Sequence, residues 1–347
     1  MVGWCYYYAG YCLSINSSNE MDKMTVNNFV GSPVDHVVFD GIPVFIKRDD
    51  LLDPVFSGNK ARKLYYLLAN DDMNLTKVIS YGSAQSNFLY SLSELAKLKQ
   101  WQCDFYVDHV PKFLRDNPAG NYLRALNNGV NIISIHKEKV TLTIEEYISR
   151  VVLPREDQAL FIPEGGSCSL AEQGIKKLAE EITQWAETEK IDDVKIMLPS
   201  GTGTTALYLQ KHLHFEVLTC TCVGSDEYLE EQFKALSKGE YAHPTILPMQ
   251  TKYHFGKLYA EFYDIWLSLK NQTGIEFELL YDPLGWLMLQ DYIKNYMESY
   301  MQRLEDNVKP VNYPSILYIH QGGLLGNETM LPRYNRMNRL DAKTRKD

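Results

Sequence analysis

Short apolar runs alternate with helical patterns along most of this chain, and that alternation is the feature that most limits its fold. In the first half we expect strands at 76–81, 103–107 and 130–135 and helices at 85–99 and 121–127. In the second half we expect strands at 193–198, 217–223 and 316–320 and helices at 169–188, 204–212, 228–237 and 256–272. This order of elements is typical of an α/β protein with mostly parallel sheets flanked by helices. The 347 residues suffice for two such layers meeting at a cleft.

Charge and hydropathy exclude several classes of partner. The net charge of −9 argues against a nucleic-acid partner, which requires a basic face. No stretch reaches the roughly 18 consecutive apolar residues of a membrane span. The six cysteines show no metal-ligand spacing and are too few for a disulfide scaffold, so we expect reduced, mostly buried thiols.

The two ends of the chain are expected to lie outside the folded unit. Residues 1–13 are apolar and rich in tyrosine, but no Lys or Arg precedes Lys23, so a signal peptide would lack its basic start. We therefore expect a poorly ordered extension and a cytoplasmic protein, with export as the alternative. Residues 333–347 are basic and polar and are expected to form a frayed tail.

One lysine stands at a predicted helix start. Residues 44–50 predict a strand that leads into a charged turn, and Gly58 permits a tight turn before the next helix. Asn59 is a suitable N-cap, which would place Lys60 in the first turn. The exposed N–H groups there disfavour an added positive charge, and a lysine that loses its proton readily suits Schiff-base chemistry. The alternative is a solvated lysine in a basic turn.

A glycine turn at 200–205 follows a predicted strand and opens a predicted helix. Its sequence, SGTGTT, supplies backbone N–H groups and hydroxyls that can surround a phosphate. The same glycines also fit a dinucleotide fingerprint, with Gly201, Gly203 and Ala206 in the pattern and Asp226 about twenty residues later. That alternative, a dehydrogenase, would leave the lysine segment without a role.

Two further turns lie between predicted strands and helices. The turn at 81–87 reads YGSAQSN, and its hydroxyls and N–H groups can face a ligand, although Ser83 or Ser86 could simply cap a helix. The turn at 163–167 reads PEGGS, and its adjacent glycines indicate a structural turn that lines the cleft.

Together these segments resemble the family of 1-aminocyclopropane-1-carboxylate deaminase and D-cysteine desulfhydrase. The resemblance rests on IKRDDL at 46–51, SGNKARKL at 57–64, the turns described above and IHQGG at 319–323, all in the family's order. It implies a pyridoxal-phosphate (PLP) enzyme of the tryptophan-synthase-β-like fold, with the cofactor between two open, twisted sheets. The larger PLP-binding domain would comprise 25–65 and 160–332, and the smaller domain 66–159.

The resemblance also implies roles for individual residues. Lys60 would carry the cofactor as a Schiff base, Ser86 would contact the substrate carboxylate or reacting centre, and Asn87 would bond the 3-hydroxyl of PLP. The implied catalytic residues are Lys60, Ser86 and Tyr281. The implied cofactor-binding residues are Asn59, Lys60, Asn87, Ser200, Gly201, Thr202, Gly203, Thr204, Thr205 and Asp282. The implied substrate-binding residues are Ser83, Gln85, Ser86, Phe255 and Gln321. No metal ligand is implied.

Departures from the family pattern guide the choice of reaction. Counting seven residues from Gly274 without a gap identifies Tyr281 as the family's acid/base tyrosine, with Asp282 near the pyridine nitrogen, whereas a gapped alignment would put Gly285 there. Phe255 stands where the family has a second tyrosine, and Gln321 replaces a Leu or Thr. Because phenylalanine transfers no proton, opening of a cyclopropane ring is disfavoured.

We therefore predict a PLP-dependent lyase or deaminase, a D-cysteine desulfhydrase-like enzyme of amino-acid metabolism. It would eliminate a β-substituent from a small D-amino acid, leaving a 2-keto acid and ammonia. The alternatives are a 1-aminocyclopropane-1-carboxylate deaminase, an inactive binding module of the same fold, and the dehydrogenase. The expected partner is a small amino acid rather than a nucleic acid or a membrane, and the resemblance leaves a homodimer open.

Overall fold

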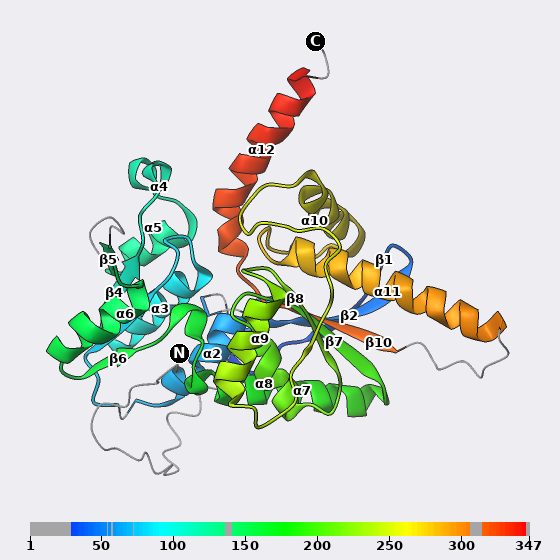
Figure 1. The fold of residues 1–347 in the computed structure, drawn as a ribbon, viewed down its shortest axis with the longest axis horizontal. Coiled ribbons are helices and arrows are strands. Elements are labelled where there is room, and N and C mark those ends of the chain that lie inside the picture. The colour runs from blue at the N-terminus through cyan, green and yellow to red at the C-terminus, as the bar shows by residue number, and fades with distance from the viewer. Residues whose placement is uncertain are drawn as a thin grey trace.

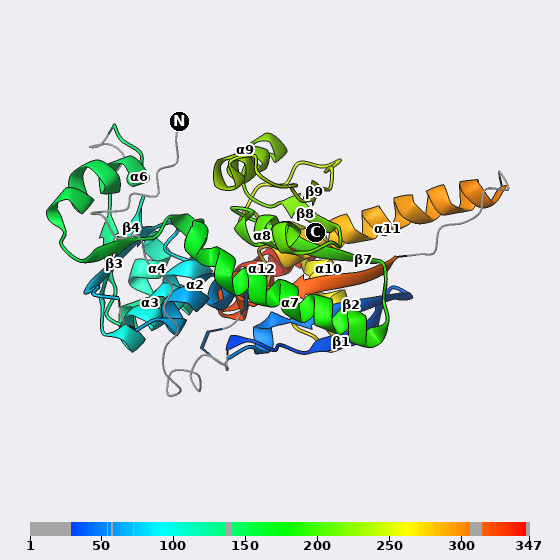
Figure 2. The ribbon, with the colours of Figure 1, turned by 90° about the horizontal axis from the view of Figure 1, so that it is seen from below.

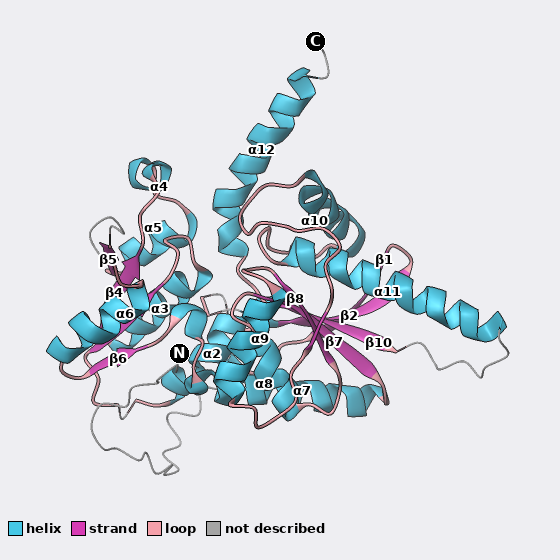
Figure 3. Ribbon diagram, in the orientation of Figure 1, coloured by secondary structure: helices cyan, strands magenta, loops and turns pink. Residues whose placement is uncertain are grey.

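The computed structural model describes residues 29–53, 55–56, 58–71, 73–135, 141–305 and 314–344. The expected extension at 1–24, with Cys5 and Cys12, lies outside these residues. Helices and strands alternate as the sequence predicts, and the strands form two separate sheets (Figures 1 and 3). In the part of the chain that the structure describes, no helix combines the length and the apolar character needed to cross a membrane.

The larger sheet has six strands in the order β1-β2-β10-β7-β8-β9. Its strands are β1 (Val34–Phe39), β2 (Ile42–Arg48), β7 (Val194–Ser200), β8 (Val217–Thr221), β9 (Thr245–Ile246) and β10 (Ser315–His320). Only β1 pairs antiparallel to its neighbour. The sequence analysis did not predict β1. A two-residue turn at Asp40 and Gly41 folds β1 back on β2, and the two strands form a hairpin.

The smaller sheet is parallel throughout, in the order β5-β4-β3-β6. Its strands are β3 (Lys77–Tyr81), β4 (Gln102–Val107), β5 (Asn131–Ser134) and β6 (Ala159–Phe161). The pairing of β6 with β3 carries this sheet two residues beyond the expected boundary at 159. The division into domains otherwise stays a prediction.

Helices cover both sheets on two faces, because parallel strands are apolar on both sides. Beside the larger sheet lie α7 (Glu172–Glu189), α8 (Thr204–His212), α9 (Asp226–Ser237), α10 (Ala260–Thr273) and α11 (Asp282–Glu305). Beside the smaller sheet lie α2 (Gly58–Ala69), α3 (Asn87–Lys99), α4 (Lys112–Asp116), α5 (Gly120–Asn127) and α6 (Ile144–Tyr147). Figure 2 shows α7 passing along the larger sheet toward α2, and α2 also packs on α7 at the junction of the two layers.

The sequence analysis missed the short elements α4, α6, β6 and β9, and two long helices also differ from expectation. The sequence analysis did not predict α11, whose sequence has a weak amphipathic pattern and a proline; the proline stands in the first turn, where it is tolerated. The expected frayed tail is also wrong as far as Thr344, because α12 (Asn327–Thr344) continues through Pro332. Fully buried Tyr334 anchors this helix in the core of the larger sheet. Residues 345–347 lie outside the described part.

The four cysteines at 103, 168, 220 and 222 are buried and form no disulfide with any residue that the structure describes, as expected.

Candidate active site

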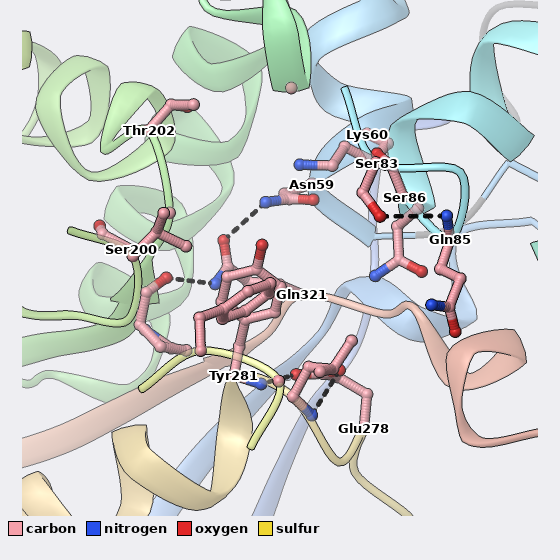
Figure 4. Close-up of a pocket in the computed structure, with 18 of the residues that line it drawn as sticks. Asn59, Lys60, Ser83, Gln85, Ser86, Ser200, Thr202, Glu278, Tyr281 and Gln321 are labelled. Carbon is pink, nitrogen blue, oxygen red and sulfur yellow. Dashed lines mark hydrogen bonds between the residues drawn. The ribbon is translucent and has the colours of Figure 1, made fainter. Parts of the chain in front are cut away.

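A cavity of about 570 Å³ lies between the two layers, and its lining includes the end of β7 and the turn that follows β3. It gathers every predicted site residue: Asn59, Lys60, Ser83, Gln85, Ser86, Asn87, Ser200, Gly201, Thr202, Gly203, Thr204, Thr205, Phe255, Tyr281, Asp282 and Gln321. Figure 4 shows the labelled side chains converging from α2, the turn before α3, the turn after β7 and the start of α11. Segments far apart in the sequence thus form one site.

The turn before α2 places Lys60 in the wall of this cavity. Gly58 has φ +68°, and a Cβ there would overlap the carbonyl oxygen of Gln321, so both the conformation and the close approach require glycine. The helix begins at Gly58, one residue earlier than expected, so the prediction of Asn59 as its N-cap is wrong. Instead, the Asn59 backbone N–H donates to the Gln321 carbonyl (3.0 Å), and its Nδ2 donates to Gln321 Oε1 (2.9 Å).

Gln321 is therefore a connector between three segments. Its Nε2 donates to the carbonyl of Pro199 at 2.7 Å, while its Oε1 accepts from Asn59. Both halves of the amide are engaged by the protein, although the side chain faces the cavity (Figure 4). Its predicted contact with substrate stays untested.

Burial, rather than the helix start, is the main reason why Lys60 loses its proton easily. Removal from water lowers the pKa of Lys60 from its ordinary 10.5 to about 8, while the carboxylates of Glu164 and Glu278 act in the opposite direction. A substantial fraction of the amine is therefore neutral near pH 8, and a neutral amine is the form that attacks an aldehyde or accepts a proton.

The turn before α3 presents Ser86 and Asn87. Ser86 Oγ accepts from the backbone N–H of Phe88 (3.0 Å) and caps the helix, so the capping that we considered as an alternative does occur. Because the hydroxyl accepts in this bond, its proton remains free to be donated into the cavity. Asn87 Oδ1 accepts from Asn121 Nδ2 at 2.7 Å, which leaves the Asn87 amide N–H₂ to face other groups.

The turn between β7 and α8 has the features of an anion site. Gly203 has φ +71°, and a Cβ there would collide with Phe233. The first N–H groups of α8 have no carbonyl partner in their own helix. The hydroxyls of Thr202 and Thr204 are 3.0 Å apart, and buried Thr205 Oγ1 has no hydrogen-bond partner among the described residues.

Lys63 lies beside this turn and was not among the predicted site residues. Its Nζ donates to the carbonyl of Gly165 (2.9 Å) and is 3.5 Å from Thr202 Oγ1. Burial, and next the charge of Lys60, hold the pKa of Lys63 well below its usual range. No carboxylate lies within 4 Å of Lys63 Nζ among the described residues, so an anion bound at the turn would stabilise its charged form.

The start of α11 decides between the two tyrosine alignments. Tyr281 lines the cavity, whereas Gly285 lies inside α11, where a Cβ would come within 2.6 Å of the Tyr318 hydroxyl. The ungapped count therefore matches the geometry. Burial, and then the nearby Glu278 carboxylate, raise the pKa of Tyr281, so its phenol keeps its proton at neutral pH and can act as a donor.

Two carboxylates lie buried next to Tyr281. Asp282 accepts from the Tyr318 hydroxyl (2.8 Å) and from the Glu278 backbone N–H (3.2 Å). Glu278, which the sequence analysis missed, accepts from the N–H groups of Leu280, Tyr281 and Asp282. Burial raises the pKa of Glu278 to about 7 and that of Asp282 above its usual range. A cationic group brought between them would lower both pKa values.

Phe255 lies beside Tyr281, where the resemblance places a second tyrosine. The two ring centroids are 5.0 Å apart, and the Phe255 side chain is 44% exposed. At this position the cavity therefore has a phenyl ring where the resemblance implies a phenol.

Other lining residues escaped prediction for identifiable reasons. Glu164 belongs to a turn that was interpreted as structural, and Arg333 to the supposed tail. Glu278 left one signal, an acid three residues before Tyr281 in an apolar run.

The donors of this cavity fit pyridoxal phosphate. The turn at 200–205 and Lys63 offer N–H groups, an orphaned hydroxyl and an amine to a phosphate, Asp282 offers a buried carboxylate to a pyridinium, and Lys60 offers an amine with a lowered pKa. One cavity of this volume can hold all three contacts.

Comparison with known proteins agrees with this geometry. The chain is 25% identical to a putative 1-aminocyclopropane-1-carboxylate deaminase of Thermotoga maritima over 82% of this chain and 90% of that protein. It is also 25% identical to a mitochondrial bifunctional D-cysteine desulfhydrase/1-aminocyclopropane-1-carboxylate deaminase of Arabidopsis thaliana over 88% of this chain and 80% of that protein.

Solved structures agree on the fold. A crystal structure of a homologue of 1-aminocyclopropane-1-carboxylate deaminase superposes with a TM-score of 0.67 at 20% identity, covering 91% of this chain and 98% of that one. No model of a protein family matches the chain.

The fold and the lysine-centred cavity define the class of tryptophan-synthase-β-like enzymes that depend on PLP, known as fold type II. Within that class, the chain is similar over more than four fifths of its length to proteins named 1-aminocyclopropane-1-carboxylate deaminase and D-cysteine desulfhydrase. This similarity favours a phosphate-binding role of Gly201 and Gly203 in a PLP enzyme over the dinucleotide interpretation.

Proposed function

We propose that this protein is a PLP-dependent lyase that removes a β-substituent from a small D-amino acid, giving a 2-keto acid and ammonia. The observation that carries the proposal is the meeting of Lys60 with the anion-binding turn at 200–205 in a single cavity. Lys60 would hold the cofactor as a Schiff base, with the turn and Lys63 at its phosphate and Asp282 at its ring nitrogen. When bound, PLP would supply an electron sink that stabilises the carbanion formed at the substrate Cα.

Three side chains of the protein would divide the remaining work. The Ser86 hydroxyl donates to the substrate carboxylate while its oxygen stays fixed by the N–H of Phe88. The neutral Lys60 amine accepts the proton from Cα, which its lowered pKa permits near neutral pH. The Tyr281 phenol, which keeps its proton, donates to the leaving group as it departs.

Phe255 supports elimination over ring opening. A second proton-transfer group beside Tyr281 would be needed at a cyclopropane substrate, and the phenyl ring 5.0 Å from Tyr281 has no such proton. A thiolate or hydroxide leaving group needs one donated proton, and Tyr281 can supply it.

The first test is borohydride reduction of the protein with bound PLP, followed by mass mapping of its peptides. We expect a yellow absorbance band that borohydride removes and a reduced adduct on Lys60. A protein that stays colourless and unmodified after addition of PLP would refute the cofactor. Pyruvate release from D-cysteine and D-serine then tests the reaction, and L-enantiomers and 1-aminocyclopropane-1-carboxylate serve as matched comparisons.

A cytoplasmic location and a homodimer stay predictions. Fractionation of cells and the solution mass of the purified protein would test them.

A further inference from the structure

Asn121 is buried behind the cavity wall and does not itself line the cavity. It lies in the first turn of α5, and its side chain is 2% exposed. Its Nδ2 donates both to Asn87 Oδ1 (2.7 Å) and to the backbone carbonyl of Gln85 (2.9 Å). Both partners are acceptors, so only one orientation of the Asn121 amide is compatible with them.

The fixed orientation of Asn121 determines the orientation of Asn87. Since Asn87 Oδ1 is occupied by the bond from Asn121, the Asn87 amide can offer only its N–H₂ to the cavity. The backbone at Gly323 leaves room for this group, because a Cβ there would lie 2.5 Å from Asn87 Nδ2. Asn121 keeps this arrangement although its own Oδ1 is buried and, within the part of the chain that the structure describes, accepts no hydrogen bond.

We infer that Asn121 is a positioning residue that fixes which end of the Asn87 amide faces the cavity. Asn87 then presents its N–H₂ as a donor to the 3-hydroxyl oxygen of bound PLP. The inference rests on the proposed cofactor. This role depends on which half of the Asn121 amide faces Asn87. A substitution that keeps the shape of the side chain but replaces the donor by an acceptor should therefore weaken PLP binding most.

Asn121→Asp is that substitution. A carboxylate cannot donate to Asn87 Oδ1, so the Asn87 amide must turn its N–H₂ toward the new Asp side chain. The Asn87 oxygen would then face the cavity and repel the 3-hydroxyl oxygen of PLP. We expect PLP affinity to fall at least about tenfold and the visible absorbance band to shift. Asn121→Ala leaves Asn87 free to choose and should weaken PLP binding by about threefold or less.

A double-mutant cycle separates this role from a general packing role. In the background of Asn87→Ala, the change Asn121→Asp should have little further effect on PLP affinity or on the spectrum. The matched control is Asn128→Asp at the C-cap of the same helix, where Nδ2 donates to Ser93 Oγ (3.0 Å). Asn128 does not line the cavity, so this variant should bind PLP as the unmodified protein does.

The outcomes decide between explanations. If Asn121→Asp binds PLP no worse than Asn121→Ala, or loses as much affinity in the Asn87→Ala background, the inference is wrong while the proposed function stands. If the unmodified protein binds no PLP, the proposed function fails and the inference falls with it. If Asn121→Asp does not fold, Asn121→Ala in both backgrounds carries the test, and equal losses would overturn the inference.

Discussion

The buried positive charges on the two sides of helix α2 differ in whether they are paired with carboxylates. Arg62 is 0% exposed and meets two carboxylates: its Nη2 lies 2.8 Å from Asp49 and its Nη1 lies 2.6 Å from Glu181. Lys60 and Lys63, on the side of the cavity, are removed from water without a carboxylate in hydrogen-bond contact among the described residues.

The paired charge contributes to stability, whereas the unpaired charges are available for binding and proton transfer. Burial alone would lower the pKa of Arg62, but Asp49 and Glu181 outweigh it and raise that pKa. The same burial, not balanced by contacts, lowers the pKa of both lysines. A paired charge is held in one state, whereas an unpaired one can change its state or bind an anion.

The largest effect is expected from Lys60→Ala. Loss of the amine removes both the attachment of PLP and the base, so activity should fall by at least about a thousandfold. The urea midpoint should not fall, because the lost charge was unpaired. A pyruvate-release assay and urea unfolding measure the two sides, and retained activity would show that Lys60 is not the cofactor lysine.

Arg62→Met should destabilise the protein by removing the buried ion pairs on the side of α2 that faces away from the cavity. It leaves Asp49 and Glu181 buried without their partner, which costs about 3–5 kcal/mol in the free energy of unfolding. Urea unfolding measures this loss. The control is Arg150→Met, whose pair with Glu146 is exposed and which should leave the unfolding curve unchanged.

The same network predicts a pH dependence. Burial raises the pKa of Glu181, but Arg62 and Lys47 overcome it and lower the value from the ordinary 4.5 to about 2. A depressed carboxyl pKa contributes stability above pH 4.5 that is lost as the pH falls toward 2. In Arg62→Met, this part of the acid-induced loss should shrink, and a stability profile with unchanged slope would contradict the assignment.

Lys63→Met tests whether the unpaired Lys63 amine contacts the phosphate of PLP. If Lys63 contacts the phosphate, PLP should bind about 10 to 100 times more weakly, since a charge-assisted hydrogen bond is worth about 1.5–3 kcal/mol. Pyridoxal, which lacks the phosphate, should bind with unchanged affinity. Equal weakening of both ligands by absorbance titration would place Lys63 elsewhere.

The smallest effect concerns the rate at which the protein takes up PLP. Because only the neutral amine attacks the aldehyde, the rate should rise with pH and level off above the Lys60 pKa of about 8. From pH 7 to pH 8 the neutral fraction grows about fivefold. Stopped-flow absorbance measures it, and a rate still rising tenfold per unit beyond pH 9 would indicate an ordinary lysine.

The segments that the sequence revealed are those in which function requires a local pattern. Gly58 and Gly203 need positive φ angles, and alternating apolar runs predict the parallel strands, so these elements appear where expected. The pattern failed for α11 and α12, whose residues are weakly amphipathic and whose position depends on distant contacts such as buried Tyr334.

By itself, the sequence determined the α/β order of elements, the lysine in the first turn of α2 and the glycine turn that opens α8. Only the tertiary structure showed that Tyr281 rather than Gly285 faces the cavity, that Glu278 and Lys63 line it, and that Asn121 donates to Asn87. The physical reason is the range of the interactions. Backbone conformation and hydrophobic periodicity act between neighbours in the chain, whereas burial, charge pairing and the orientation of an amide depend on residues that folding brings together.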